Sequence, residues 1–99
     1  MSDSGVNDPP VTSVDTAMIE TEILRQTGER GPERSICPSE VARALAPAEA
    51  EWRSLLTPVR QAAARLATAG HVEILRKGKP VAPEAMRGVI RLRTRGDSQ

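Results

Sequence analysis

The sequence predicts a mainly α domain with a small β-hairpin, an α+β fold. Three observations lead to this fold class. Apolar residues recur at helical spacing up to about residue 69, and the spacing changes to alternation after Gly70. Proline and glycine residues separate the periodic segments. The chain of 99 residues is long enough for one domain and too short for two.

The first helix is expected to begin between residues 12 and 16 and to end before the Gly31-Pro32 pair. Thr12 and Asp15 have the spacing of a capping box. Residues 1–14 are polar and aperiodic, which predicts a disordered tail, and residues 96–99 are predicted to be a disordered end. The domain is therefore expected over residues 15–95. The apolar stripe of its first helix consists of Met18, Ile19, Ile23 and Leu24.

Two proline-started helices are predicted in the middle of the chain. Residues 35–37 are long enough only for a short edge strand, and a helix should then begin at Pro38 and end before Pro47. Residues 48–56 can form a further short helical stretch, with Trp52, Leu55 and Leu56 facing inward. A longer helix is expected over residues 58–69, started by Thr57-Pro58 and ended by Gly70.

Alternating residues predict two strands near the end of the chain. Val72 and Ile74 flank Glu73, and Ile90 and Leu92 alternate with arginines. Residues 77–88 are rich in Gly and Pro, which predicts a long loop between the two strands. The resulting order is helix, short strand, helix, helix, strand, loop, strand. This is the order of a winged helix-turn-helix domain, in which a three-helix core carries a hairpin called the wing.

Residues 20–95 also resemble a family of small bacterial winged-helix domains of unknown function. The matching segments are ETEIL at 20–24, ICPSEVARAL at 36–45, WR at 52–53, PVR at 58–60, ARLA at 64–67, KG at 77–78 and RGVIRLR at 87–93. The resemblance implies a winged-helix fold and brings no known activity, ligand or catalytic residue. The chain departs from a compact helix-turn-helix by an insertion at residues 46–57.

Charge is distributed unevenly along the chain. Residues 1–51 hold 4 basic and 10 acidic side chains, whereas residues 52–99 hold 10 basic and 3 acidic ones, which gives balances of −6 and +7. Such asymmetry indicates a polyanionic partner for the basic half. The alternative is that folding pairs the charges of the two halves across the surface.

The helix over residues 58–69 is the first candidate binding element. One face carries Val59, Leu66 and alanines and should pack on the other helices. The opposite face carries residue types that hydrogen-bond base edges in the major groove of double-stranded DNA, with a small alanine that permits close approach. A solvated helix face has the same pattern, so both interpretations stay open. The residues of this face are Arg60, Gln61, Ala64, Arg65 and Thr68.

The predicted wing, residues 76–95, is the second candidate binding element. Seven basic side chains surround it, and a wing of this kind can lie along phosphates. The alternative is an edge strand that its charges protect from aggregation. The basic residues are Arg76, Lys77, Lys79 and Arg87 at the loop, and Arg91, Arg93 and Arg95 on one face of the last strand.

Several functional classes are not expected. The sequence has no glycine-rich phosphate loop, nucleophile elbow or paired carboxylates, so no catalytic residue, cofactor or enzymatic activity is predicted. Cys37 and His71 are single residues of their kind, which predicts no metal site, and Cys37 is expected to be buried. The absence of Phe and Tyr argues against binding of single strands. No membrane span or signal peptide is recognisable, so a cytoplasmic protein is expected.

Two functional hypotheses follow from the sequence. The first is a double-stranded DNA-binding module or transcriptional regulator that uses the helix over residues 58–69 and the basic wing. Since one such helix has a small footprint, specific regulation would require a homodimer. The second is a non-enzymatic module that binds a protein partner and no DNA. The two differ in whether the basic side chains form one surface or are neutralised by Glu20, Glu22, Glu49 and Glu51.

Overall fold

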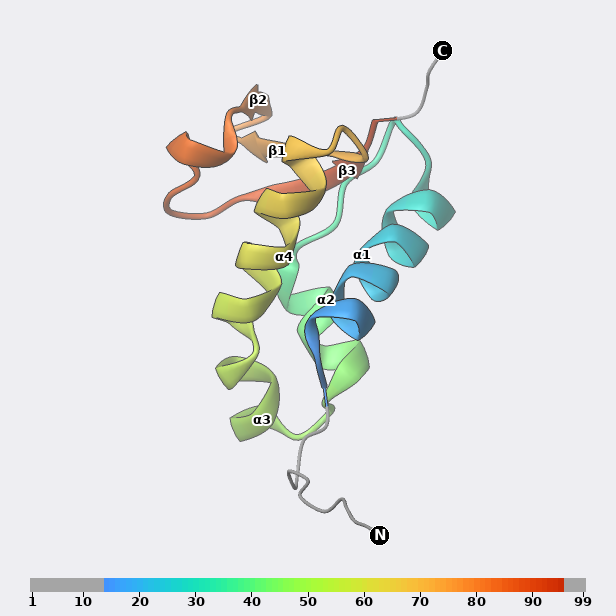
Figure 1. The fold of residues 1–99 in the computed structure, drawn as a ribbon, viewed down its shortest axis with the longest axis vertical. Helices are drawn as coiled ribbons and strands as arrows, with labels where there is room; N and C mark the ends of the chain where they lie inside the picture. Colours follow the sequence, from blue (N-terminus) through green and yellow to red (C-terminus); the bar gives the residue numbers. More distant parts are fainter. Residues whose placement is uncertain (1–13, 96–99) are drawn as a thin grey trace, which may run out of the picture.

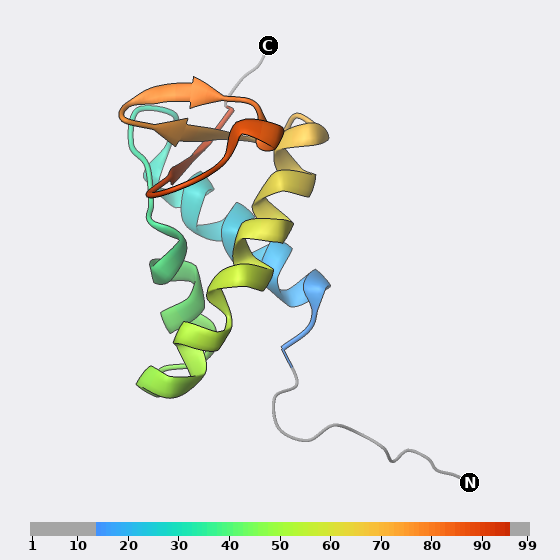
Figure 2. The same cartoon turned by 90° about the vertical axis from the view of Figure 1, so that its left-hand side faces the viewer.

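The computed structural model describes residues 14–95, so the predictions for residues 1–13 and 96–99 lie outside the described part. Within it, the helices form a bundle and a small sheet lies across one end of that bundle (Figures 1 and 2). This arrangement confirms the α+β fold class. No helix in this part is long and apolar enough to cross a membrane. The elements are α1 (Thr16–Arg30), α2 (Pro38–Leu45), α3 (Glu49–Ser54), α4 (Leu56–Thr68), β1 (Val72–Arg76), β2 (Lys79–Val81), the 3-10 turn η2 (Pro83–Ala85) and β3 (Arg91–Thr94).

The sheet has the order β2-β1-β3, with both pairs antiparallel. Ile36 adds a one-residue bridge to β3: the Ile36 and Leu92 amides each donate to the other's carbonyl oxygen at 2.8 Å. This bridge confirms the predicted short edge strand. Together with α1, α2 and α4, it makes the arrangement compatible with a winged-helix fold.

The core lies where α1, α2 and α4 meet the inner face of the sheet. Its members are aliphatic, and alanines on α4 let that helix approach its neighbours closely. Asp15 caps α1 by accepting a 3.0 Å hydrogen bond from the Met18 amide. The buried residues of the core are Ile19, Ile23, Ile36, Val41, Ala42, Val59, Ala62, Ala63, Leu66, Val72, Ile74, Ile90 and Leu92.

The predicted apolar stripe of α1 is wrong in part. Met18 and Leu24 are 45 % and 41 % exposed, whereas Ile19, Ile23 and Thr27 are buried. The buried face follows the spacing of four residues, and it includes Thr27 because the hydroxyl donates to the Ile23 carbonyl at 2.8 Å. Thr27 can be buried because its hydroxyl group is hydrogen-bonded, whereas the larger Met18 and Leu24 stay exposed.

The start of α4 also differs from the prediction. The helix begins at Leu56 and not at residue 58, because Leu55 already has helical dihedral angles (φ −87°, ψ −7°). Thus α3 passes into α4 with only one intervening residue. Pro58 falls in the first turn of α4, where its missing amide hydrogen removes no helical hydrogen bond.

A strand replaces part of the predicted loop over residues 77–88. Lys77 and Gly78 have positive φ angles of 55° and 82°, the requirement for a two-residue type I′ hairpin turn. The turn lets β2 pair with β1 in the register Arg76↔Lys79. The predicted pairing of the two longer strands is nevertheless present, since β1 pairs with β3.

The predicted short helical stretch in the insertion corresponds to α3. Trp52 of α3 is half-buried and packs against the hydrophobic core. The guanidinium carbons of Arg43 and Arg53 lie 4.5 Å and 5.2 Å from the centroid of the Trp52 ring. The Arg43 contact links α2 to α3, whereas the Arg53 contact lies within α3.

Candidate nucleic-acid interface

The two faces of α4 are divided as the sequence predicts. Val59, Ala62, Ala63 and Leu66 are buried. On the other side, Gln61, Arg65 and Thr68 are exposed, and Arg60 and Ala64 are half-buried at the margins. The helix therefore presents a polar face with Arg60 and Arg65 at its two edges.

Arginines from three segments converge around Gly88. Arg60 on α4 donates from Nη1 to the Gly88 carbonyl oxygen at 3.0 Å. Arg76, at the end of β1, places Nε 4.0 Å from the Cβ position of residue 88. Arg87 is the preceding residue and is exposed. We call Arg60, Arg76 and Arg87 the Gly88 arginine cluster; none of them forms an ion pair with a carboxylate of the described residues.

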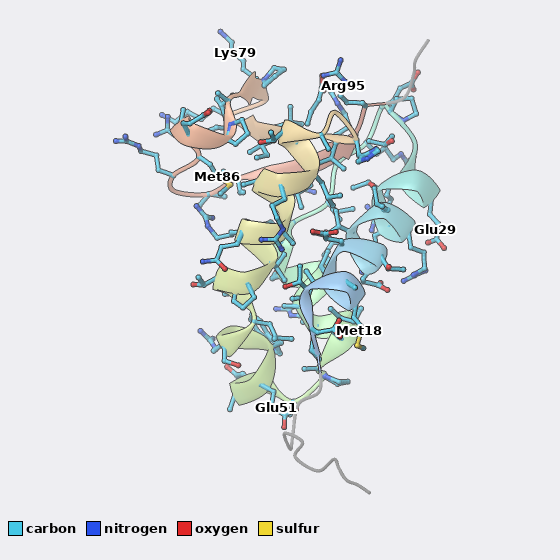
Figure 3. The ribbon with its side chains drawn as sticks, viewed as in Figure 1. Met18, Glu29, Glu51, Lys79, Met86 and Arg95 are labelled. Atoms are coloured by element: carbon cyan, nitrogen blue, oxygen red, sulfur yellow. The ribbon has the colours of Figure 1, made fainter. Side chains whose placement is uncertain are left out.

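Two lysines extend this basic surface along the hairpin. Lys77 lies in the β1–β2 turn and Lys79 opens β2 opposite Arg76. Both are exposed, and neither is paired with a carboxylate in residues 14–95. Figure 3 shows Lys79 projecting from the end of the molecule that carries the sheet, and Glu51 at the opposite end. We call Arg60, Arg76, Lys77, Lys79 and Arg87 together the wing-side basic surface.

The arginines of β3 lie on a different surface. Leu92 points into the core, so strand alternation places Arg91 and Arg93 on the outer face of the sheet, away from the helices. Arg91 donates to the Ser35 hydroxyl at 2.7 Å and to its carbonyl oxygen at 3.0 Å. Arg93 forms an ion pair with Glu73, its partner on β1. Arg95 follows β3 and is exposed.

Arg65 is neutralised within the fold. Its Nε lies 2.9 Å from Oε2 of Glu20 on α1, and the two side chains are 50 % and 31 % exposed. Thr68, on the same face, donates its hydroxyl hydrogen to the Ala64 carbonyl oxygen at 2.9 Å. Gln61 makes no side-chain hydrogen bond to another described residue.

The acidic half of the chain is largely neutralised by neighbouring arginines. Arg25 pairs with Glu22 and Glu29 on α1, and Arg53 pairs with Glu49 on α3. The pKa of Glu22 is lowered chiefly by its hydrogen bond from Arg25 and further by Gln26, while desolvation opposes the change. The acidic side chains of residues 14–51 therefore form no ion pairs with the wing-side basic surface.

A family comparison agrees with the extent of this domain. The model of a family described as "Protein of unknown function (DUF3253)" matches residues 16–95. The chain belongs to the DUF3253 family. No curated protein matches the sequence. The match runs from the first residue of α1 to Arg95, so it includes the whole candidate surface of this DUF3253 domain.

An apolar groove borders the Gly88 arginine cluster in the DUF3253 domain. It has a volume of about 230 Å³ and lies between the start of α2, the first turns of α4 and the segment before β3. Val89, one of its walls, is 84 % exposed. Cys37 also lines the groove and is half-buried, not buried as predicted, and its thiol accepts a hydrogen bond from Ser39. Residues 14–95 contain no group of three His, Cys, Asp or Glu side chains suited to a metal ion.

The contacts that organise the surface could not be found by sequence reasoning. Gly88 acts through its backbone carbonyl, and no sequence pattern links it to Arg60, which lies 28 residues earlier. Glu20 is recognisable as an acidic residue that could neutralise the surface, but its pairing with Arg65 spans 45 residues. Only the folded arrangement of α1 and α4 brings these two side chains together.

Proposed function

We propose that this DUF3253 domain is a non-catalytic module that binds double-stranded DNA. In this proposal the polar face of α4 enters the major groove and the wing-side basic surface contacts the phosphate backbone. The Gly88 arginine cluster is the observation that supports it. The side chains of Arg60 and Arg76 both approach Gly88, Arg87 directly precedes it, and none of the three has a carboxylate partner among the described residues.

The charges of the wing-side basic surface set the expected salt dependence. If its five side chains each neutralise one phosphate, the slope of log K against log salt is about −4.5. Raising the salt concentration from about 50 to about 200 mM then weakens binding by roughly 500-fold, or about 3.7 kcal/mol. Arg91 is bonded to Ser35 and Arg93 is paired with Glu73, so neither is counted, and Arg95, which follows β3, is left out as well.

The exposed face of α4 supplies groups suited to base edges. Gln61 has a free amide, and a glutamine can form two hydrogen bonds with an adenine. Ala64 is small and permits close approach of the helix. A single helix of this kind covers about 600–1,000 Å², so regulation of transcription at a specific site would require a homodimer.

The test is fluorescence anisotropy of a labelled mixed-sequence duplex at the two salt concentrations. The informative variant is Arg60→Ala/Arg76→Ala, which removes two members of the Gly88 arginine cluster. The matched control is Arg25→Ala/Arg53→Ala, which changes net charge equally at ion-paired positions on α1 and α3. Circular dichroism establishes that each protein is folded.

We expect micromolar binding at low salt that falls steeply with added salt. The cluster variant should lose affinity and reduce the slope by about 1.8, while the control keeps the wild-type slope. Equal losses in both variants would show that only net charge matters, and absence of binding by the folded wild type at low salt would refute the proposal.

The alternative is a module that binds a protein partner. The observation in its favour is the apolar groove with the exposed Val89, because protein interfaces bury such side chains. Val89→Asp should then abolish partner binding, and neither the wild type nor this variant should bind the duplex. This function gains support only if the duplex titration is negative.

A further inference from the structure

We infer that Glu20 is a positioning residue that pairs with Arg65, neutralises its charge and thereby limits the affinity of the domain for non-specific duplexes. The inference rests on the proposed function and adds to it a determinant of affinity. It concerns a carboxylate on α1, outside the helix and the wing that are expected to contact DNA.

Arg65 lies on the face of α4 that is proposed to contact DNA, so its pairing with Glu20 affects DNA binding. It is exposed on α4, four residues after Gln61 and three before Thr68, at the edge of the polar face that adjoins α1. An arginine at this position could reach either a phosphate or a guanine edge. In the folded domain its Nε instead lies 2.9 Å from Glu20.

Glu20 is fixed at this place by its neighbours in the sequence. Ile19 and Ile23 are buried at 2 % and 0 % exposure, and they anchor this side of α1 in the core beside α4. The backbone of Glu20 therefore cannot withdraw from α4. Its carboxylate remains at the margin of the polar face, with 31 % of the side chain exposed.

The Glu20–Arg65 pair is expected to affect DNA binding more than the folding stability of the domain. Exposed ion pairs contribute little to folding stability, because solvent screens them and ordering two side chains costs entropy. A DNA phosphate near α4 would meet a net charge of zero at this pair. Arg65 binds Glu20 through Nε, so its Nη groups could still donate to the phosphate, but the neighbouring carboxylate would repel the phosphate and offset the attraction.

Glu20→Gln should therefore raise the affinity for a mixed-sequence duplex by about three- to fivefold, the factor that corresponds to release of a surface ion pair. The released Arg65 should also neutralise one more phosphate, so the salt slope should become steeper by about 0.9. A purely structural role of Glu20 would not change this slope.

The experiment is the anisotropy titration at several salt concentrations, made with wild type, Glu20→Gln and Glu29→Gln. Glu29→Gln is the matched control: it makes the same charge change on the same helix, but Glu29 pairs with Arg25 and not with α4. A third comparison is Glu20→Gln in an Arg65→Ala background. There the gain in affinity should disappear, because Glu20 acts through Arg65.

The outcomes separate this inference from the proposed function. If wild type binds DNA and Glu20→Gln behaves like Glu29→Gln, or if the gain persists without Arg65, the inference is wrong and the proposed function stands. If neither wild type nor Glu20→Gln binds DNA, both are wrong. A gain specific to Glu20→Gln, with the steeper slope, establishes Glu20 as the restraint on Arg65.

Discussion

Substituting Ile36 with alanine tests the bridge that joins the loop before α2 to the sheet. Ile36 is fully buried and exchanges two 2.8 Å hydrogen bonds with Leu92. Alanine keeps both hydrogen bonds, so the expected effect comes from the lost side chain alone. Removal of a buried isoleucine side chain costs about 2–5 kcal/mol, and we expect about 3–4 kcal/mol at this fully enclosed position.

That loss is large for a domain of this size. The 82 described residues correspond to a total unfolding free energy of about 4–12 kcal/mol. The midpoint of thermal unfolding should fall by about 12–30 °C. The measurement is far-ultraviolet circular dichroism during heating and during urea titration. Val89→Ala is the matched control, since Val89 is 84 % exposed and its truncation should change stability by less than about 0.5 kcal/mol.

A cost below about 1 kcal/mol for Ile36→Ala, close to that of the control, would refute the reasoning. Residue 36 would then not be enclosed between α2 and β3. The edge strand, and with it the winged-helix-like arrangement, would have to be abandoned.

Two further predictions concern the hairpin turn and α1. Lys77→Asn should stabilise the domain by about 0.5–1 kcal/mol in urea titrations, because Lys77 has a φ of 55° and asparagine tolerates this region better in a type I′ turn; a loss of stability would contradict the turn assignment. Glu22→Gln should destabilise the domain at neutral pH, because the hydrogen bond from Arg25 holds the pKa of Glu22 below its ordinary value. The stabilisation by the ionised carboxylate is present above the unfolded pKa of about 4.3 and is lost as the pH falls through the lower folded value. Urea titrations at a series of pH values should therefore show wild type and variant converging in acid, and a difference independent of pH would contradict the role of this ion pair.

Most element boundaries could be predicted because local chemistry determines them. Pro38 and Gly70 start and stop helices through their own backbone properties, so these positions were predictable without tertiary information. The strand β2 was missed because three residues with a central proline carry no alternation signal. Its existence depends on the turn at Lys77 and Gly78, where a lysine occupies a conformation more typical of asparagine or glycine.

The candidate site could be predicted as a set of residues but not as a surface. Helical periodicity correctly separated the buried and exposed faces of α4. It could not show that Arg65 pairs with Glu20 or that Arg93 pairs with Glu73, because these pairs form between separate elements. The alternation with Ile90 and Leu92 correctly placed Arg91 and Arg93 on one face of the last strand, but it could not show that Arg91 bonds to Ser35 instead of joining the wing-side basic surface.

The arrangement around Trp52 gives the domain a built-in optical probe. The chain contains no tyrosine or phenylalanine, so all intrinsic aromatic fluorescence comes from one indole on α3, which contacts Arg43 of α2. Emission therefore reports the docking of α3 on α2, whereas far-ultraviolet circular dichroism reports the helices as a whole. Any separation of α3 from the bundle before global unfolding would appear as an emission change that precedes the loss of helical signal.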